Sequence, residues 1–409
     1  MKKLFGVALG IMAAMGGFVD IGDLVFNTQV GARFGYQMIW VVVIGVIGII
    51  VFSEMCGRVV AVSGRPVFDI VRDRFGYRTG LFALIASELL ILLTLAAELG
   101  GVALVLQLLT ATPLSLAVII GLISVVLVIW LTSFETLERV FGYVGLFLIV
   151  YVVAAVTLGP DWNQLAQGFV PSIRGGQDTL PYLYFGVGLI AAAMTPYEVY
   201  FFSSGGVEER WTTKDLGLNR ANAIAGYGLG GVLSIALIAT TAQVFEPVGI
   251  EPESIGSVAL AAQIPLGHLG FLAACLGMMF AIGGATVDTA LSGAYNLGQF
   301  FGWDWGRYRP PAEASRFTVA WLAFFTLATV IALTGVDAVK LTEYAVLFSV
   351  VALPFTYLPI LLVARDESYM GDYRNGIFAN VVGWAYFALL MVISVVALPL
   401  MILTNMGQS

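Results

Sequence analysis

The stretch GGFVDIGDLVFN (residues 16–27) places two aspartates, Asp20 and Asp23, inside an apolar run that is long enough to cross a bilayer. The whole chain has 409 residues, of which 59% are hydrophobic and 11% are charged. Soluble domains carry about 25% charged residues. Together with a mean hydropathy of +0.94, this composition excludes a soluble globular fold and a large soluble catalytic domain. We therefore predict an all-α integral membrane protein.

Apolar runs between charged or Pro/Gly breaks predict the membrane spans of a single transmembrane domain over residues 1–409. The first run continues through Asp20 without a small-residue cleavage site, which indicates a span rather than a signal peptide. Residues 65–75 mix charged and apolar residues at helical spacing, which is typical of a short interfacial helix. The eleven predicted spans cover residues 4–33, 37–62, 80–109, 113–132, 138–158, 181–207, 217–245, 266–302, 316–336, 340–363 and 376–404.

The distribution of Lys and Arg predicts the orientation of the chain. With the N-terminus in the cytoplasm, 16 of the 19 basic residues fall in cytoplasmic segments, and only Arg33, Arg174 and Lys340 fall outside. Cytoplasmic loops are enriched in Lys and Arg. We therefore expect a multi-pass protein of a bacterial plasma membrane with a cytoplasmic N-terminus and an external C-terminus.

Ten of the eleven spans divide into two groups of five, and an odd number of spans inverts the second group relative to the first. This plan predicts a first repeat over residues 1–158, a second repeat over 175–364 and an extra helix over 376–404. In transporters built this way, the substrate site lies where the first helix of each repeat is broken near the midplane. The first and sixth predicted spans, residues 4–33 and 181–207, are the corresponding pair and are called helix 1 and helix 6.

Helix 6 carries its own break in AAAMTPYEVYFFSSGG (residues 191–206), where Pro196 precedes Glu198. Proline removes a backbone donor and frees carbonyls in the preceding turn. No mid-span Lys or Arg is available to pair with Asp20, Asp23 and Glu198, and unpaired acids inside a membrane indicate function. We predict a hard-oxygen cation site at this depth. Its other ligands are expected from the backbone carbonyls of Ile21 or Ala193 and from the hydroxyl of Thr195.

Other acids inside the spans are candidates for the ion pathway. Glu98 is near mid-depth and is a candidate for a group beside the bound ion, a proton acceptor or a vestibule charge. Glu88 and Asp288 lie nearer the predicted cytoplasmic side, and Glu343 lies at the predicted outer mouth. Glu54 has Arg58 four residues later, which indicates an ordinary salt bridge along one helix.

The order of these motifs along the chain resembles the Nramp family of divalent metal transporters. DIGD (20–23) followed by GARFGYQMIW (31–40) resembles the family's helix 1 signature, and TPYEVYFFS (195–203) resembles its helix 6 signature. AELGGVA in helix 3, GAYNLGQ in helix 8 and LPF at 353–355 follow in the family's order. The resemblance implies a LeuT-like fold of two inverted five-helix repeats plus an eleventh helix.

Departures from the family pattern bear on the transported ion. The family's metal-binding Asp is kept as Asp20, whereas its soft Met ligand is replaced by Thr195 and the next His by Tyr197. The helix 6 Asn is replaced by Glu198, and the helix 10 Gln by Ala352. Two further replacements are Asp23 for an Asn and Phe202 for the second His. This pattern is similar to the Nramp-related magnesium transporter branch.

These observations predict a secondary transporter, not an enzyme, that imports Mg²⁺, with Mn²⁺ also accepted, by alternating access. Carboxylate, carbonyl and hydroxyl oxygens suit such hard cations. Loss of both histidines argues against proton coupling. The alternative is a proton-coupled Mn²⁺/Fe²⁺ symporter of the Nramp type. No cofactor, nucleic acid or protein partner is expected beyond the ion and the bilayer.

Two further classes fit less well. In a sodium-coupled amino-acid carrier, three carboxylates at the site would repel the carboxylate of the substrate. An intramembrane aspartyl protease needs acids on two helices, whereas Asp20 and Asp23 share one segment.

Overall fold

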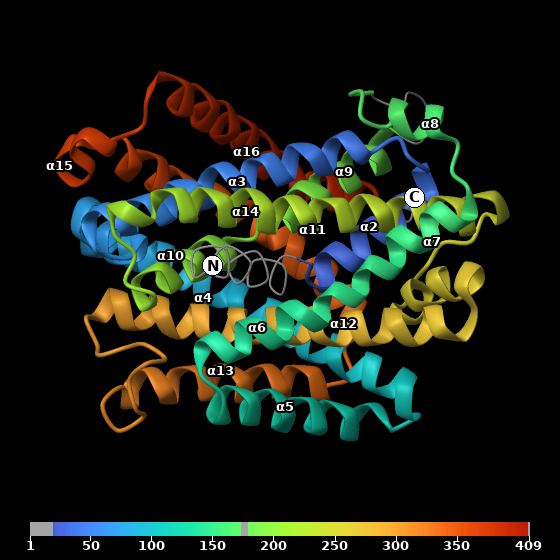
Figure 1. Ribbon diagram of the computed structural model, residues 1–409, viewed down its shortest axis with the longest axis horizontal. Helices are drawn as coiled ribbons and strands as arrows, with labels where there is room; N and C mark the ends of the chain where they lie inside the picture. The colour runs from blue at the N-terminus through green and yellow to red at the C-terminus, as the bar shows by residue number, and fades with distance from the viewer. Residues whose placement is uncertain (1–18, 173–178, 408–409) are drawn as a thin grey trace.

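The computed structural model describes residues 19–172 and 179–407, and every regular element in these ranges is helical (Figure 1). The longer elements pack side by side in one bundle. The helices of this bundle are α2 (Ile21–Phe34), α3 (Ile39–Ser63), α4 (Val67–Thr110), α5 (Leu114–Leu131), α6 (Phe134–Gly145), α7 (Val150–Leu158), α9 (Thr179–Ala193), α10 (Pro196–Glu208), α11 (Leu216–Val244), α12 (Ile255–Phe301), α13 (Ser315–Leu333), α14 (Ala338–Ala364) and α16 (Ile377–Leu403). Short helices in the connections are η1 (Leu146–Ile149), α8 (Trp162–Gln167), η2 (Thr213–Asp215), η3 (Glu246–Val248), α15 (Glu367–Met370) and η4 (Gly371–Tyr373).

Ten helical segments of the described chain are long and apolar enough to cross a membrane. They correspond to predicted spans 2 to 11, with α6, η1 and α7 together forming the fifth. The predicted first span falls partly outside the described residues, because its beginning lies within residues 1–18 and its described part is α2, which has 14 residues. The chain is therefore a multi-pass helical membrane protein.

Two glycines bend long helices that the sequence divides differently. Gly76 has φ 80° inside α4, so the predicted interfacial helix continues into the third span through one sharp bend. Gly267 has φ 65° inside α12, so a helical segment from Ile255 precedes the predicted eighth span. Both positive φ values favour glycine, because a Cβ atom would strain the backbone there. The two bends therefore lie close to the predicted boundaries at residues 80 and 266.

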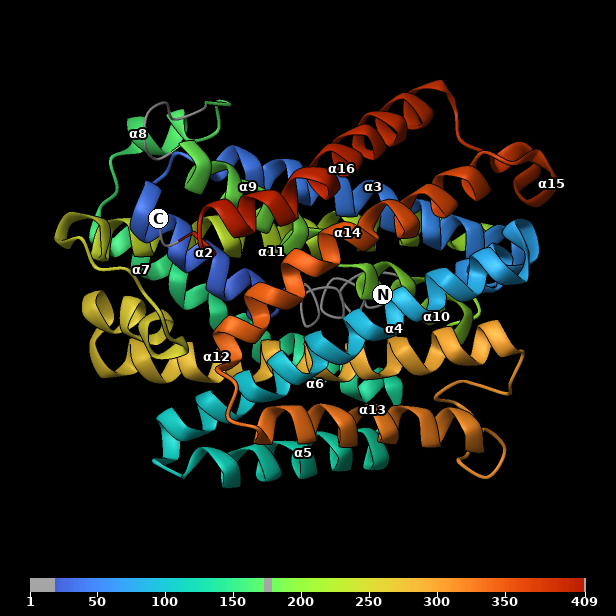
Figure 2. The same cartoon turned by 180° about the vertical axis from the view of Figure 1, so that it is seen from behind.

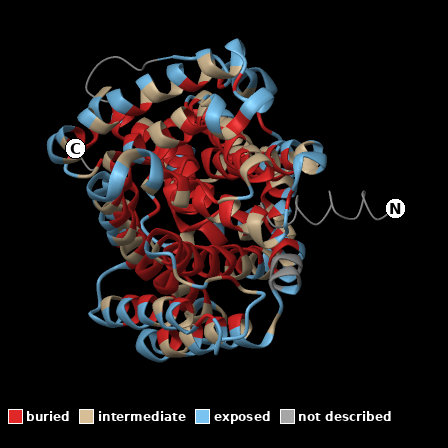
Figure 3. Ribbon diagram, turned by 90° about the vertical axis from the view of Figure 1, so that its left-hand side faces the viewer, coloured by how far each residue is buried: buried red, intermediate tan, exposed pale blue. Residues whose placement is uncertain are grey.

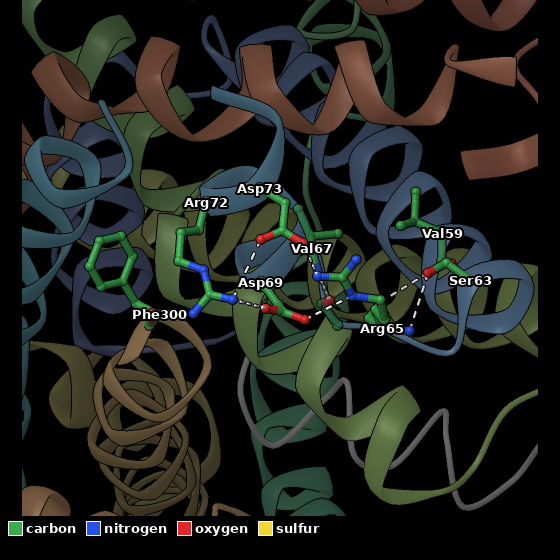
Figure 4. Close-up of polar contacts among 9 residues, drawn as sticks. Val59, Ser63, Arg65, Val67, Asp69, Arg72, Asp73 and Phe300 are labelled. Atoms are coloured by element: carbon green, nitrogen blue, oxygen red, sulfur yellow. Dashed lines mark hydrogen bonds and ion pairs between the residues drawn. The ribbon is translucent and has the colours of Figure 1, made fainter. Parts of the chain in front are cut away.

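Polar groups at the start of α4 connect this helix to α10 and α12 (Figure 4). Arg65 forms ion pairs with Asp69 and Asp73. Arg72 donates to the carbonyl of Phe300 at the end of α12 over 2.6 Å. The amide of Val67 donates to Ser203 Oγ of α10 over 2.9 Å. The segment predicted to lie on the membrane surface is thus fastened to two spans of the bundle.

Burial separates a central group of helices from a peripheral one (Figure 3). Most residues of α2, α9 and α10 are buried inside the bundle. In contrast, α5 and α16 bury only a few residues each and expose large apolar side chains. Exposed apolar faces of this kind suit contact with lipid. The two short helices that carry Asp20 and Glu198 therefore lie deep in the protein.

Candidate functional site

Helix 6 is broken at the place that the sequence predicts. α9 ends at Ala193 and α10 begins at Pro196, so Met194 and Thr195 are not helical. Pro196 occupies the first helical position, where its missing N–H costs no helical hydrogen bond. The carbonyl of Met194 accepts a hydrogen bond from the hydroxyl of Tyr357 on α14 over 3.0 Å. The hydroxyl of Tyr357 thus supplies a hydrogen-bond donor to a backbone carbonyl that has no helical partner because of the break.

α2 begins at a matching position in helix 1. Asp20 is its N-cap, and Asp20 Oδ1 accepts a hydrogen bond from the amide of Asp23 over 3.0 Å. An aspartate at this position satisfies an amide in the first turn that has no partner within the helix. Residues before Val19 lie outside the described part, so the predicted first half of this helix is not placed.

The two helix starts are joined directly by side chains. Tyr197 Oη, on α10, donates to Asp20 Oδ2 over 3.1 Å. Thr195 Oγ1 donates to Glu198 Oε1 over 2.8 Å, and Asn27 Nδ2 donates to Asp23 Oδ1 over 3.3 Å. These contacts bring the predicted residues of helices 1 and 6 into one polar region.

Several oxygens in this region remain available to a ligand. Asp23 Oδ2 and Glu198 Oε2 are buried and accept no hydrogen bond. The side chains of Asp20, Asp23 and Glu198 are exposed by only 1%, 3% and 5%. None of the ion pairs found among the described residues involves them. Buried charge without a partner is costly, so these oxygens favour an incoming cation.

A small cavity beside the break reaches part of this region. Its lining includes Asp20, Thr195 and Tyr197, with α4 and α14 forming the opposite walls. Asp23 and Glu198 do not line it. Within residues 19–172 and 179–407, no three His, Cys, Asp or Glu side chains are gathered closely enough to enclose a metal ion. The expected ligands therefore surround the break without converging on one point.

The two predicted carbonyl ligands differ in their surroundings. Ile21 is in the first turn of α2, where helix geometry directs its carbonyl toward Val25. Ala193 is the last residue of α9, where terminal carbonyls lack helical partners. Ala193 is therefore the better placed of the two. Ala352 is buried on α14, two residues before Pro354.

The other predicted acids occupy three separate places. Glu98 is fully buried, accepts a hydrogen bond from Thr289 Oγ1 over 3.0 Å and leaves Oε2 without a partner. Asp288 is on the same turn of α12 as Thr289. Glu343 accepts from Gln29 Nε2 over 2.8 Å beside a second, wider cavity. Away from the site, Glu54 forms the predicted ion pair with Arg58 at 3.1 Å.

Four polar residues of the site were missed by sequence reasoning. Their only signal is a hydroxyl or amide within an apolar span, and many such residues in this chain merely bond to their own helix. Ser292 Oγ instead donates to the carbonyl of Tyr197 on α10 over 3.0 Å. The four are Asn27, Thr289, Ser292 and Tyr357.

Comparison with known families identifies the chain. A family model described as natural resistance-associated macrophage protein-like (Nramp) matches residues 10–399. The chain belongs to the Nramp family. Membership confirms the predicted resemblance and the prediction of a transporter rather than an enzyme.

Curated relatives of this Nramp protein are similar over nearly their whole length. The divalent metal cation transporter MntH of Deinococcus radiodurans is 25% identical over 389 residues, covering 92% of this chain and 86% of that protein. The divalent metal cation transporter MntH of Ralstonia nicotianae is 25% identical over 407 residues, covering 96% and 90%.

Solved structures confirm the predicted fold. A structure of the Eremococcus coleocola manganese transporter superposes with a TM-score of 0.79 at 20% identity, covering 96% of this chain and 85% of that chain. MhsT in complex with L-phenylalanine superposes with a TM-score of 0.64 at 15% identity, covering 96% and 98%. The all-helical LeuT-like architecture is therefore shared with both structures.

Proposed function

We propose that this Nramp protein carries a hard divalent metal cation across a bacterial plasma membrane by alternating access. The observation that carries the proposal is the direct contact between the two helix starts, from Tyr197 to Asp20, with Asp23 Oδ2 and Glu198 Oε2 buried in the same region and accepting no hydrogen bond. Asp20, Asp23, Thr195 and Glu198 would supply oxygen ligands, directly or through water.

Mn²⁺ is the first candidate for the transported ion. Relatives over nearly the whole chain are named as divalent metal cation transporters, and a solved structure of the same fold is named as a manganese transporter. These names favour the Mn²⁺ alternative of the sequence analysis over the Mg²⁺ reading. Mn²⁺ accepts carboxylate, carbonyl and water oxygens, so the ligand set of this chain suits it.

Mg²⁺ is the second candidate, and one observation favours it. Thr195 occupies the break and directs a hydroxyl to Glu198 Oε1, so the predicted ligands of this region are all oxygens. Mg²⁺ binds oxygen ligands and keeps several of its waters. A site without a thioether gives soft metals no advantage over Mg²⁺.

Ion flux into proteoliposomes tests the proposal. Uptake of Mn²⁺ is measured with Mg²⁺, Ca²⁺ and Fe²⁺ as competitors, for the wild type and for Asp20→Ala. The matched control is Glu313→Ala, because Glu313 is an exposed acid in the connection between α12 and α13. We expect Asp20→Ala to lose uptake and Glu313→Ala to keep it. Full activity of Asp20→Ala would refute the proposed site.

Coupling to protons is measured in the same vesicles with a lumenal pH dye. Acidification that depends on the metal would support the proton-coupled alternative, in which Glu98 is the first candidate acceptor because one of its oxygens has no partner. No acidification would support uptake driven by the ion gradient and the membrane potential, which supplies about 2.3 kcal/mol per charge at 100 mV.

Orientation with a cytoplasmic N-terminus is tested by labelling single introduced cysteines from either side of the membrane.

A further inference from the structure

A pocket of about 340 Å³ lies between the end of α5, the start of α13 and the connection that joins α12 to α13. Figure 2 shows α5 and α13 side by side along the lower edge of the bundle. None of the residues that line this pocket also lines the cavity beside Asp20. The pocket is therefore separate from the proposed ion site.

The charge of the pocket is positive. Arg307 and Arg309 line it, and none of the described residues that line it is acidic. Asp304 forms an ion pair with Arg309 at 2.6 Å, but its side chain is 66% exposed and it does not line the pocket. An exposed ion pair contributes little stability, so a second anion can compete for Arg309. The pocket therefore favours an anionic ligand.

Arg307 is held in position and keeps a donor without a partner. Its Nη2 donates to the carbonyl of Thr132, the C-cap of α5, over 2.7 Å. Its backbone amide, rather than its guanidinium, donates to Glu208 at the end of α10. The Nε of Arg307 is buried and has no hydrogen-bond partner. No ion pair found among the described side chains includes Arg307. A buried donor without a partner is costly, so this site favours a ligand with acceptor oxygens.

The other lining side chains indicate where the ligand lies in the membrane. Trp130 of α5 and Trp321 of α13 both line the pocket, with 6.1 Å between their ring centroids. Tryptophan is enriched at the membrane–water interface, where its ring lies at the level of the lipid headgroups. The planar guanidinium of arginine matches the oxygens of a phosphate group. Arginine and tryptophan together therefore favour a phosphate at headgroup level.

Apolar surface beside the pocket favours a phosphate that belongs to a lipid. Leu127 and Leu131 of α5 are 48% and 75% exposed, and Val319 of α13 is 64% exposed. Each is within one helical turn of a residue that lines the pocket. A free phosphate would leave this surface uncovered, whereas acyl chains would cover it.

We propose that this pocket binds the phosphodiester headgroup of one anionic phospholipid, whose acyl chains lie along α5 and α13. Basic pockets between membrane helices recognise anionic headgroups in this way. Because the amide of Arg307 is bonded to Glu208, a bound headgroup would also hold the connection against the end of α10. The proposal does not depend on which ion the protein carries.

Phospholipid binding to the purified full-length protein tests the inference. Native mass spectrometry counts the lipids retained per chain during titration with dioleoyl phosphatidylglycerol or dioleoyl phosphatidylcholine at one ionic strength. We expect the first phosphatidylglycerol to bind at least tenfold more tightly than the first phosphatidylcholine. Arg307→Gln and Arg309→Gln should each lower this affinity at least fivefold. Arg78→Gln is the matched control and should not, because Arg78 is an exposed arginine that does not line the pocket.

Four results would overturn the inference. Equal affinity for the two lipids would mean that the pocket does not recognise charge, and unchanged affinity in Arg309→Gln would place the lipid elsewhere. An equal loss in Arg78→Gln would assign binding to general surface charge. Displacement of phosphatidylglycerol by an equal concentration of glycerol 3-phosphate would assign the pocket to a soluble phosphate.

Two further points keep the test decisive. If Arg307→Gln does not fold without its bond to Thr132, the half-exposed Arg309 still gives a variant that leaves this bond in place. Asp20→Ala should keep lipid binding and lose ion uptake, so the two proposals succeed or fail independently.

Discussion

A single methyl group at Gly31 should disturb the packing that holds α2 in place. A Cβ atom added there would lie 2.0 Å from Thr241 Oγ1 and 2.5 Å from the carbonyl oxygen of Ile238 on α11. The Thr241 hydroxyl is held by its own hydrogen bond to Leu237, and a helix carbonyl cannot turn away. The Gly31→Ala variant therefore forces α2 and α11 apart.

The expected loss of stability depends on whether the atoms that contact the added Cβ can move. Overpacking a core costs about 1–3 kcal/mol, and backbone obstacles place this variant near the upper value. For a chain of this length, that destabilisation lowers the melting temperature by roughly 3–4 °C. Because Asp20 caps the start of the same helix, Mn²⁺ uptake should fall as well.

The assay is thermal unfolding in detergent, followed by the loss of monodisperse protein on size exclusion. Gly228→Ala on α11 is the matched control, since a Cβ atom there meets nothing within 4 Å. Combining Gly31→Ala with Thr241→Ala should restore less than half of the loss, because the Ile238 carbonyl stays in place. A melting temperature for Gly31→Ala within 1 °C of the Gly228→Ala control would refute this account of α2 packing.

Three other changes give separate tests. Thr195→Met should raise uptake of Cd²⁺ relative to Mn²⁺ at least tenfold, because a thioether favours softer metals, whereas Thr195→Val should not. Tyr357→Phe should lower stability by about 1–3 kcal/mol, because the Met194 carbonyl loses its partner; unchanged melting would contradict this. The side chain and amide of Ser368 lower the pKa of Asp366, so the folded state favours the ionised form. This stabilisation is present above the pKa that Asp366 has in the unfolded chain, and it is lost as pH falls through the lowered pKa of the folded state. The melting temperature of Asp366→Asn should therefore be lower than that of the wild type near pH 7, and the two should converge near pH 3.

The break in helix 6 was predictable because its cause is local. Proline at position 196 cannot continue a helix, so α10 begins at the expected residue. Hydropathy likewise located the spans within the described chain. Boundaries were also predicted close to the bends at Gly76 and Gly267, but the helical segment from Ile255 that precedes Gly267 was missed.

The partners of the site residues were not predictable for a different reason. Tyr357 lies 163 residues from Met194, and Tyr197 lies 177 residues from Asp20. Such pairs depend on how whole helices pack, which apolar periodicity does not encode. The choice between Mn²⁺ and Mg²⁺ also cannot be made from the residue types alone, because both ions accept the oxygen ligands that the sequence supplies.

In the proposed site, the hydrogen bonds of Asp20 would link the binding of the ion to the relative positions of two helices. One oxygen is held by α2 through Asp23, and the other is held by α10 through Tyr197. The two helices belong to different predicted repeats, so any displacement between the repeats changes the environment of this carboxylate. If the ion binds at Asp20 as proposed, its binding free energy would depend on the arrangement of the two predicted repeats. Linkage would make this dependence reciprocal, because the ion would shift the repeats by the same factor as they change its affinity.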